Sequence, residues 1–418
     1  MTNTEKLEPI MKGKILLLLI LAVPFFSACV PEYTKVNVRK ELGVAMVDSS
    51  ATNETVYLFY NLKQLAENRK IIFGHHESTS YGVGWSGDAQ RSDVKDVTND
   101  FPGLYGWDFY FLFHQPQSEV ARAKERYKKL VTEAYERGGV NVFCWHEYNP
   151  LTDNNFYDTT RAVEKILPGG DCYLKYLADL DSIADYAKIL VDSTGKPIPI
   201  IFRPYHEFDG SWFWWGKHFC TPGEFKTLWR ETVTYLRDRK KVRNFIYAFS
   251  PDRNFKTKEE YLERYPGDDY VDVLGFDDYW DFTPNGDGLG WVRKKLIIIS
   301  ELAKEKNKVA ALTETGLESI PNPVWWSDRL MKVINDDSVN IAYAMVWRNA
   351  NTVHHYAPYK GDFSAEDFIN FSRSGNILFN RALPDLYHKK ITGDTIKLIE
   401  RNKWIFIFKL MSGNPFPF

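Results

Sequence analysis

Eight short, mostly apolar segments recur along this chain of 418 residues, and amphipathic segments lie between them. Their apolar residues do not alternate cleanly with polar ones, which is typical of strands buried on both faces of a sheet. The predicted strands are residues 71–76, 104–109, 140–146, 199–207, 244–250, 271–279, 309–315 and 341–347.

The segments between these strands predict helices, because their apolar residues recur at helical spacing. The clearest are residues 118–137, 171–190, 221–241, 291–306 and 323–336. Thr221 and Glu224 form a capping-box pattern, with Pro222 in the first turn. Strands that alternate with helices form parallel crossover units, and eight such strands close a barrel. We therefore predict an α/β fold, a (β/α)8 TIM barrel, as a single catalytic domain over residues 53–388.

A doubly wound open sheet is the alternative fold, but no glycine-rich phosphate loop follows the first predicted strand, which argues against its nucleotide-binding versions. Residues 389–418 lie beyond the eightfold pattern. Within them, the apolar run 404–408 is a candidate for one more strand, and no function is assigned to this tail.

The N-terminal residues have the pattern of a targeting signal. Lys12 and Lys14 precede an apolar run, residues 15–26, that is too short for a comfortable membrane span. Small residues then stand directly before Cys29, as in a bacterial lipobox. We predict a signal peptide over residues 1–29, lipidation of Cys29, a leader over residues 30–52, and a protein held in the bacterial cell envelope only by this lipid. An ordinary cleaved signal and a buried N-terminal helix are the alternatives.

Net charge is −2, and no basic stripe runs along the chain, so a nucleic-acid partner is not expected. Aromatic residues make up 16%, which fits a packed core as well as sugar-stacking loops. Cys144 lies inside an apolar run and is expected to be buried. Cys172 and Cys220 flank loops, and an oxidising compartment would allow a disulfide between them. We expect a monomer.

Polar residues fall at the end of every predicted strand. In barrel enzymes the active site lies at this C-terminal face, so eight such endings together indicate a catalytic site. These residues are His75, His76, Glu77, Asp108, His146, Asn149, Arg203, His206, Glu207, Asp252, Asp277, Asp278, Tyr279, Glu314, Trp347 and Arg348.

Glu207 and Glu314 end the fourth and seventh predicted strands, which lie nearly opposite each other around an eight-stranded barrel. Hydrolysis of a glycosidic bond needs two carboxyl groups that flank the bond, and a retaining enzyme holds them about 5–5.5 Å apart. The pair therefore predicts a glycoside hydrolase, and opposed strand ends can deliver the spacing of a retaining one, with the two roles interchangeable at this point.

Other chemistries fit the sequence less well. Three His-Glu pairs offer possible metal ligands, but there is no His-Glu-x-x-His spacing, and neighbouring residues of a strand point to opposite faces. No Gly-x-Ser-x-Gly elbow is present, and Cys144 lies in mid-strand. We predict neither a metal ion nor a cofactor. A barrel enzyme for small phosphorylated substrates and a non-catalytic glycan-binding lipoprotein are the remaining alternatives.

The motifs around the two glutamates resemble those of glycoside hydrolase family 26, whose best-known members are β-mannanases. Residues 203–216 are similar to the acid/base motif of that family, and residues 312–316 to its nucleophile motif. Shorter matches extend the resemblance over about residues 55–388. They are 73–75, 105–108, 145–146, 149–150, 275–279 and 346–349.

The resemblance implies that Glu207 is the general acid/base and Glu314 the nucleophile. It also implies contacts to substrate or to the catalytic pair by His75, His146, His206, Trp212, Tyr279, Trp347 and Arg348. Trp212 and Trp347 would stack on sugars, Tyr279 would hydrogen-bond Glu314, and His206 would orient the nucleophile or the substrate. Trp214 and Trp215 are expected to pack in the rim of the barrel.

The family also implies the partner of the protein, a β-mannan-type polysaccharide that is cleaved internally at β-1,4 bonds. β-1,3-Xylan, mixed-linkage β-glucan and release of mannobiose from chain ends are the alternatives within the same fold and mechanism.

Overall fold

The computed structural model describes residues 38–113, 115–283 and 288–411 of the chain. The predicted signal peptide and Cys29 lie outside these residues. Within the described part, no helix is both long and apolar enough to cross a membrane.

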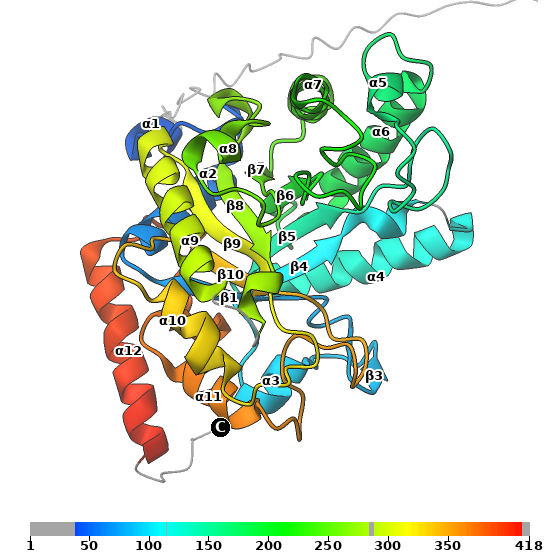
Figure 1. Ribbon diagram of the computed structural model, residues 1–418. Coiled ribbons are helices and arrows are strands. Elements are labelled where there is room, and N and C mark those ends of the chain that lie inside the picture. The colour runs from blue at the N-terminus through cyan, green and yellow to red at the C-terminus, as the bar shows by residue number, and fades with distance from the viewer. Residues whose placement is uncertain (1–37, 114, 284–287, 412–418) are drawn as a thin grey trace, which may run out of the picture. The chain divides into compact units, whose positions relative to one another are not determined.

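Eight parallel strands close into a barrel (Figure 1). Neighbouring strands pair in the order β1-β4-β5-β6-β7-β8-β9-β10, and β10 pairs with β1 to complete the ring. The strands are β1 (Ile71–His76), β4 (Leu104–Asp108), β5 (Val140–Trp145), β6 (Ile200–Pro204), β7 (Phe245–Phe249), β8 (Val273–Asp278), β9 (Val309–Thr315) and β10 (Tyr343–Val346). Every residue of these eight strands is buried except Asp108, the last residue of β4. Burial on both faces explains why apolar and polar residues do not alternate in their sequences. The predicted barrel is confirmed.

Three shorter strands lie outside the ring. The hairpin β2 (Tyr81–Gly82) and β3 (Trp85–Ser86) follows β1, and β11 (Ile377–Leu378) adds to the start of β1 in parallel.

Helices follow or precede the barrel strands along the chain (Figure 1). They are α1 (Val38–Leu42), α2 (Asn53–Glu67), α3 (Asp93–Thr98), α4 (Gln117–Glu136), α5 (Val163–Ile166), α6 (Tyr173–Ile189), α7 (Pro222–Thr234), α8 (Lys258–Leu262), α9 (Gly288–Lys306), α10 (Met331–Ile334), α11 (Ala365–Arg373) and α12 (Gly393–Met411). The predicted capping box of α7 is present, because Thr221 Oγ1 accepts from the Glu224 amide and the Glu224 carboxylate accepts from the Thr221 amide.

The C-terminal tail differs from its prediction. The run 404–408 belongs to helix α12 and not to a further strand. Ile396 and Ile399 of this helix are buried in the main core, and Glu400 forms a 3.0 Å ion pair with Lys70 beside β1.

The candidate disulfide between Cys172 and Cys220 is wrong for this structure, in which both thiols are free. Cys172 lies at the N-terminus of α6. The Cys220 thiol is buried and donates to the Trp215 carbonyl at 3.3 Å, and an Arg264 guanidinium N–H lies 3.4 Å from its sulfur. Cys144 is buried within β5, as expected.

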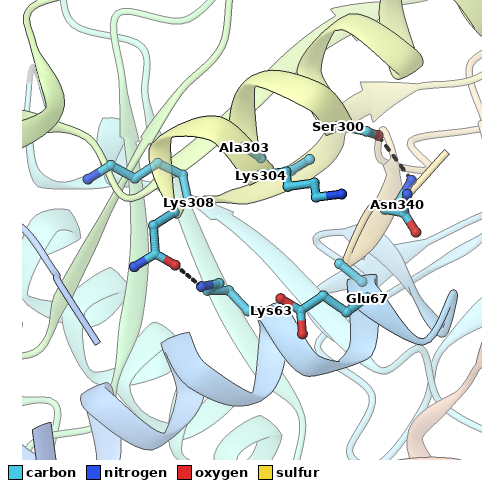
Figure 2. Close-up of a pocket in the computed structure, with 10 residues that line it drawn as sticks. Lys63, Glu67, Ser300, Ala303, Lys304, Lys308 and Asn340 are labelled. Carbon is cyan, nitrogen blue, oxygen red and sulfur yellow. Dashed lines mark hydrogen bonds between the residues drawn. The ribbon is translucent and has the colours of Figure 1, made fainter. Parts of the chain in front are cut away.

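A polar cavity of about 310 Å³ lies at the N-terminal end of the barrel (Figure 2). It is lined by the end of α2, the end of α9 and the residues that lead into β9, including Lys63, Glu67 and Lys304. This is the end of the barrel opposite the polar strand endings.

Candidate active site

Glu207 is positioned by a sharp turn immediately after β6. The strand ends at Pro204, three residues earlier than predicted, and both Tyr205 and Glu207 have left-handed backbones, with φ of 48° and 54°. The Glu207 amide donates to the Ser250 carbonyl at 2.9 Å. This turn costs conformational energy for a residue with a side chain, and it aims the carboxyl group over the mouth of the barrel.

Glu314 is positioned by an irregularity in β9. Phe276 of β8 pairs with Leu312, but the next residue, Asp277, pairs with Glu314, so β9 contains one extra residue, Thr313. Such a bulge re-aims the side chains that follow it. The Glu314 side chain is buried at the end of this strand.

A buried arginine connects the two strands. One Arg203 amino group contacts the Glu314 carboxylate, and the other donates to Asp277 Oδ2 at 2.7 Å. Tyr279 donates its hydroxyl proton to Glu314 Oε2 at 2.7 Å, as the family resemblance implied. These donors stabilise Glu314 as a carboxylate, which is the form that a nucleophile requires.

The two candidate catalytic carboxyl groups are close together. One oxygen from each of Glu207, Asp277 and Glu314 lies within 4.8 Å of the others. Such close oxygens are compatible with the short spacing of the carboxyl groups in retaining glycosidases, about 5–5.5 Å.

The pKa of Glu207 is held well above its ordinary value, first by burial and then by the nearby carboxyl groups of Asp277 and Asp252. A negative charge on the adjacent Glu314 would also raise this pKa. In the structure Arg203 contacts the Glu314 carboxylate and compensates its charge, so burial takes the leading role. The raised pKa favours the protonated form of Glu207, which is the form that a general acid requires.

Trp212 contacts the acid directly, because its indole N–H donates to Glu207 Oε2 at 2.7 Å. The sequence predicted a sugar-stacking role for Trp212, and the structure adds this hydrogen bond to it. Trp214 and Trp215 are fully buried, as expected.

Two histidines extend the site in a chain of hydrogen bonds. His146 Nδ1 lies 2.6 Å from Asp108 Oδ2, and His146 Nε2 lies 3.1 Å from His206 Nε2. Burial lowers the pKa of His206 well below its ordinary value, so its ring is neutral. His206 has no hydrogen bond to Glu314 among the described residues, so orientation of the nucleophile by this ring stays a prediction.

His75 is placed differently from His76. The His75 ring is buried, and its Nδ1 lies 3.0 Å from Ser78 Oγ. The His76 ring packs against Trp347, with ring centres 4.3 Å apart, and lines a cavity. Substrate contact by His75 stays a prediction, while His76, a strand-end residue to which the family resemblance gave no role, borders the open space.

Two cavities open at the C-terminal ends of the strands. One, of about 460 Å³, lies over the ends of β10, β1, β4 and β5, and we call it the Arg348 cavity. It is lined by His76, Glu77, Tyr81, Asp108, Tyr110, Phe111, Tyr127, His146, Phe156, Tyr157, Trp347, Arg348 and His354.

The other cavity, of about 470 Å³, lies over the ends of β6, β7, β8 and β9, and we call it the Trp280 cavity. It is lined by Glu207, Trp212, Asp252, Arg253, Asn254, Tyr279, Trp280, Thr283, Gly316, Leu317, Glu318 and Tyr356. Trp280 is 67% exposed, unlike most large aromatic side chains of this chain.

Two sets of side chains are spaced closely enough to approach a metal ion. They are Asp108 with Cys144 and His146, and Asp277 with Glu207 and Glu314. In both sets the ligand atoms already have partners, since Asp108 binds His146, and Arg203 binds Asp277 and Glu314. Hydrogen bonds and ion pairs therefore account for the geometry of both sets.

Sequence reasoning placed Arg203, Asp252 and Asp277 among the strand endings but gave them no role. Their roles depend on which strands become neighbours and on the bulge at Thr313, which a strand pattern does not reveal. Arg203, four residues before Glu207, carried the available signal, because a buried arginine requires acidic partners.

A parallel barrel with two close carboxyl groups at the C-terminal ends of its strands is the arrangement that glycoside hydrolases use. The model of glycosyl hydrolase family 26 matches residues 47–364, well over half of the chain. The chain belongs to this family.

Several relatives are mannan endo-1,4-beta-mannosidases. A mannan endo-1,4-beta-mannosidase of Bifidobacterium adolescentis is 32% identical over 358 residues, which cover 80% of this chain and 35% of that protein. The chain thus spans about a third of the length of this relative.

Solved structures are also similar. A GH26 beta-mannanase from Bacteroides ovatus shares 43% identity with a TM-score of 0.76, and the match covers 82% of this chain and 100% of that one. A modular endo-beta-1,4-mannanase from Cellulomonas fimi shares 37% identity with a TM-score of 0.78, covering 83% and 80%.

Proposed function

We propose that this protein is a retaining, endo-acting β-1,4-mannanase that cleaves mannan, galactomannan or glucomannan. The observation that carries the mechanism is the close approach of Glu207 and Glu314, one protonated by burial and the other stabilised as a carboxylate. The mannan substrate rests on the similarity to the mannanases named above.

The reaction proceeds in two displacements. Glu314 attacks the anomeric carbon while Glu207 donates its proton to the oxygen of the departing sugar, which leaves a covalent glycosyl-enzyme. Glu207, now ionised, removes a proton from a water molecule that attacks the same carbon and releases Glu314. Two inversions retain the β configuration.

The general acid must reach the oxygen of the leaving sugar. Glu207 lines the Trp280 cavity, so the leaving portion of the glycan, the aglycone, would lie there. The portion that stays on Glu314, the glycone, would then extend into the Arg348 cavity. Space on both sides of the reacting bond supports cleavage within a chain.

Replacement of the nucleophile tests the mechanism. Glu314→Ala is expected to lose at least about 10⁴-fold in kcat on mannan. Azide is expected to restore turnover, because it fits the vacated space and attacks the anomeric carbon, giving an α-glycosyl azide. Unchanged activity of the variant would contradict the assignment of Glu314. In a separate measurement on the unsubstituted protein, proton NMR of early products should show the β-anomer first.

The substrate is tested by product analysis on mannan, galactomannan, glucomannan, β-1,3-xylan and mixed-linkage β-glucan. We expect release of mixed manno-oligosaccharides from the first three. Cleavage of only the xylan or the mixed-linkage glucan would show that this glycan, and not mannan, is the substrate. Exclusive release of mannobiose would indicate attack from chain ends.

Cell-envelope attachment through a lipid on Cys29 is part of the proposal, and it is supported by the charged, apolar and small-residue pattern of residues 12–29. Metabolic labelling with a fatty-acid analogue should mark the full-length protein and leave a Cys29→Ser variant unlabelled.

A further inference from the structure

The chain repeats the local structure of its acid/base residue at another strand. Glu77 follows His76 at the end of β1, just as Glu207 follows His206 after β6. Glu77 has a left-handed backbone with φ of 53°, against 54° for Glu207. A left-handed backbone is uncommon for a residue with a side chain, so both turns hold a glutamate where it costs energy.

The backbone hydrogen bonds of the two turns also correspond. The Glu77 amide donates to the Gly106 carbonyl of β4 at 2.9 Å, and the Glu77 carbonyl accepts from the Ser80 amide. The Glu207 amide donates to Ser250, and its carbonyl accepts from Gly210. In each case the glutamate is tied to the neighbouring strand and turned over the mouth of the barrel.

Few groups offset the burial of the Glu77 carboxyl group: the Tyr127 hydroxyl and the Ser80 side chain act as hydrogen-bond donors, and the Arg126 charge lies nearby. Its side chain lines the Arg348 cavity, although the residue is only 4% exposed. The Tyr127 hydroxyl lies 3.0 and 3.1 Å from its two oxygens, but that hydroxyl has one proton and serves both. Burial raises the pKa of Glu77 to about 7. No cation forms an ion pair with it among the described residues.

The rest of the cavity suits a sugar chain. Trp347 and Tyr81 offer aromatic surface, and the Arg348 guanidinium lies over the Tyr81 ring at 5.9 Å. Arg348 likewise has no ion-pair partner within the part of the chain that the structure describes. A few polar groups converging in an aromatic cavity are the usual pattern for a bound small molecule or sugar.

We propose that Glu77 is a specificity-determining residue that binds hydroxyl groups of a glycone sugar at least one unit away from the reacting one. This inference rests on the proposed function, because the glycone direction follows from Glu207 as the acid. The carboxyl group accepts from the sugar hydroxyls, and Arg348 donates to the same part of the chain.

The test compares two substrates in Glu77→Ala and Glu77→Gln, made in the full chain. Mannotetraose fills the Arg348 cavity, whereas 2,4-dinitrophenyl β-mannoside places its single sugar only beside Glu314. We expect Glu77→Ala to lower kcat/KM for mannotetraose about 10- to 100-fold. For the aryl mannoside, kcat/KM of the variant should stay within about twofold of the value for the unsubstituted protein. Glu77→Gln, which keeps an acceptor oxygen, is expected to lose less.

A binding measurement separates this inference from turnover. In an inactive Glu314→Ala background, calorimetry should show the same loss of mannotetraose affinity when Glu77→Ala is added. Glu147→Gln is the matched control, since Glu147 also follows a histidine and is buried but does not line either cavity.

Equal losses on both substrates, or no loss on mannotetraose, would overturn the assignment of Glu77. Failure of the proposed function is distinguishable, because the unsubstituted protein would then release no sugar from any mannan substrate.

Discussion

The hydrogen bond from Trp212 to Glu207 is expected to tune the pKa of this acid. Its indole N–H donates to Glu207 Oε2, and this bond favours the ionised carboxylate, so it lowers the Glu207 pKa against the larger effect of burial. Trp212→Phe keeps an aromatic ring and removes the donor. We expect the alkaline limb of the kcat/KM profile for mannan to move to higher pH, and kcat to fall about tenfold.

Trp280→Phe is the control for this experiment, because the exposed Trp280 lines the same cavity without a hydrogen bond to Glu207 in the described structure. Its alkaline limb should not move. A limb that stays in place for Trp212→Phe as well would show that this indole does not set the pKa of the acid.

Burial of the Glu147 carboxyl group is expected to lower the free energy of unfolding. Neither of its carboxyl oxygens has a hydrogen-bond partner among the described residues, and burial raises its pKa well above the ordinary value. The folded state therefore keeps a proton that the unfolded chain loses above about pH 4.5. The destabilisation is absent below that pH and grows as pH rises toward the folded pKa.

Glu147→Gln should therefore raise the free energy of unfolding by about 1–3 kcal/mol at pH 7 and leave it nearly unchanged at pH 4. Denaturant unfolding at both pH values measures this, with the exposed Glu263→Gln as control. A gain of equal size at pH 4 would point to packing and not to the proton.

At the scale of elements, helix α12 is expected to contribute stability without contributing to catalysis. Ile399 is buried against the barrel, and Glu400 pairs with Lys70 at the start of β1, far along the strand from the catalytic end. Ile399→Ala should cost about 2–3 kcal/mol in urea unfolding, while kcat stays unchanged.

Leu398→Ala provides the matched comparison on the same helix, since Leu398 is 54% exposed. We expect its unfolding free energy to change by no more than about 1 kcal/mol. Equal costs at the two positions would mean that α12 does not pack as described.

At the scale of the whole molecule, the core contains no disulfide bond among the residues that the structure describes. Cys144, Cys172 and Cys220 are all free thiols. Titration of a denatured, unreduced Cys29→Ser variant should find three thiols, and its thermal midpoint should not change with reductant. A single thiol would show that Cys172 and Cys220 pair after all.

Much of the barrel follows from the sequence alone, because buried parallel strands and their helices have patterns that do not depend on distant residues. The limits of β1 and β9 are as predicted, and so is the capping box of α7. The placement of Glu207 just after β6 and of Glu314 near the end of β9, on nearly opposite sides of the barrel, was also predictable, since strand order in such a barrel follows chain order.

Only the tertiary structure decided what surrounds these two residues. The left-handed turn at Glu207, the extra residue in β9 and the placement of Arg203 between Asp277 and Glu314 arise from contacts between strands far apart in the chain. The same holds for Glu77, because the preceding histidine that it shares with Glu207 is visible in the sequence, whereas the shared left-handed backbone is not. Local patterns determine elements, whereas burial and charge pairing, which set the pKa values, exist only once the barrel has closed.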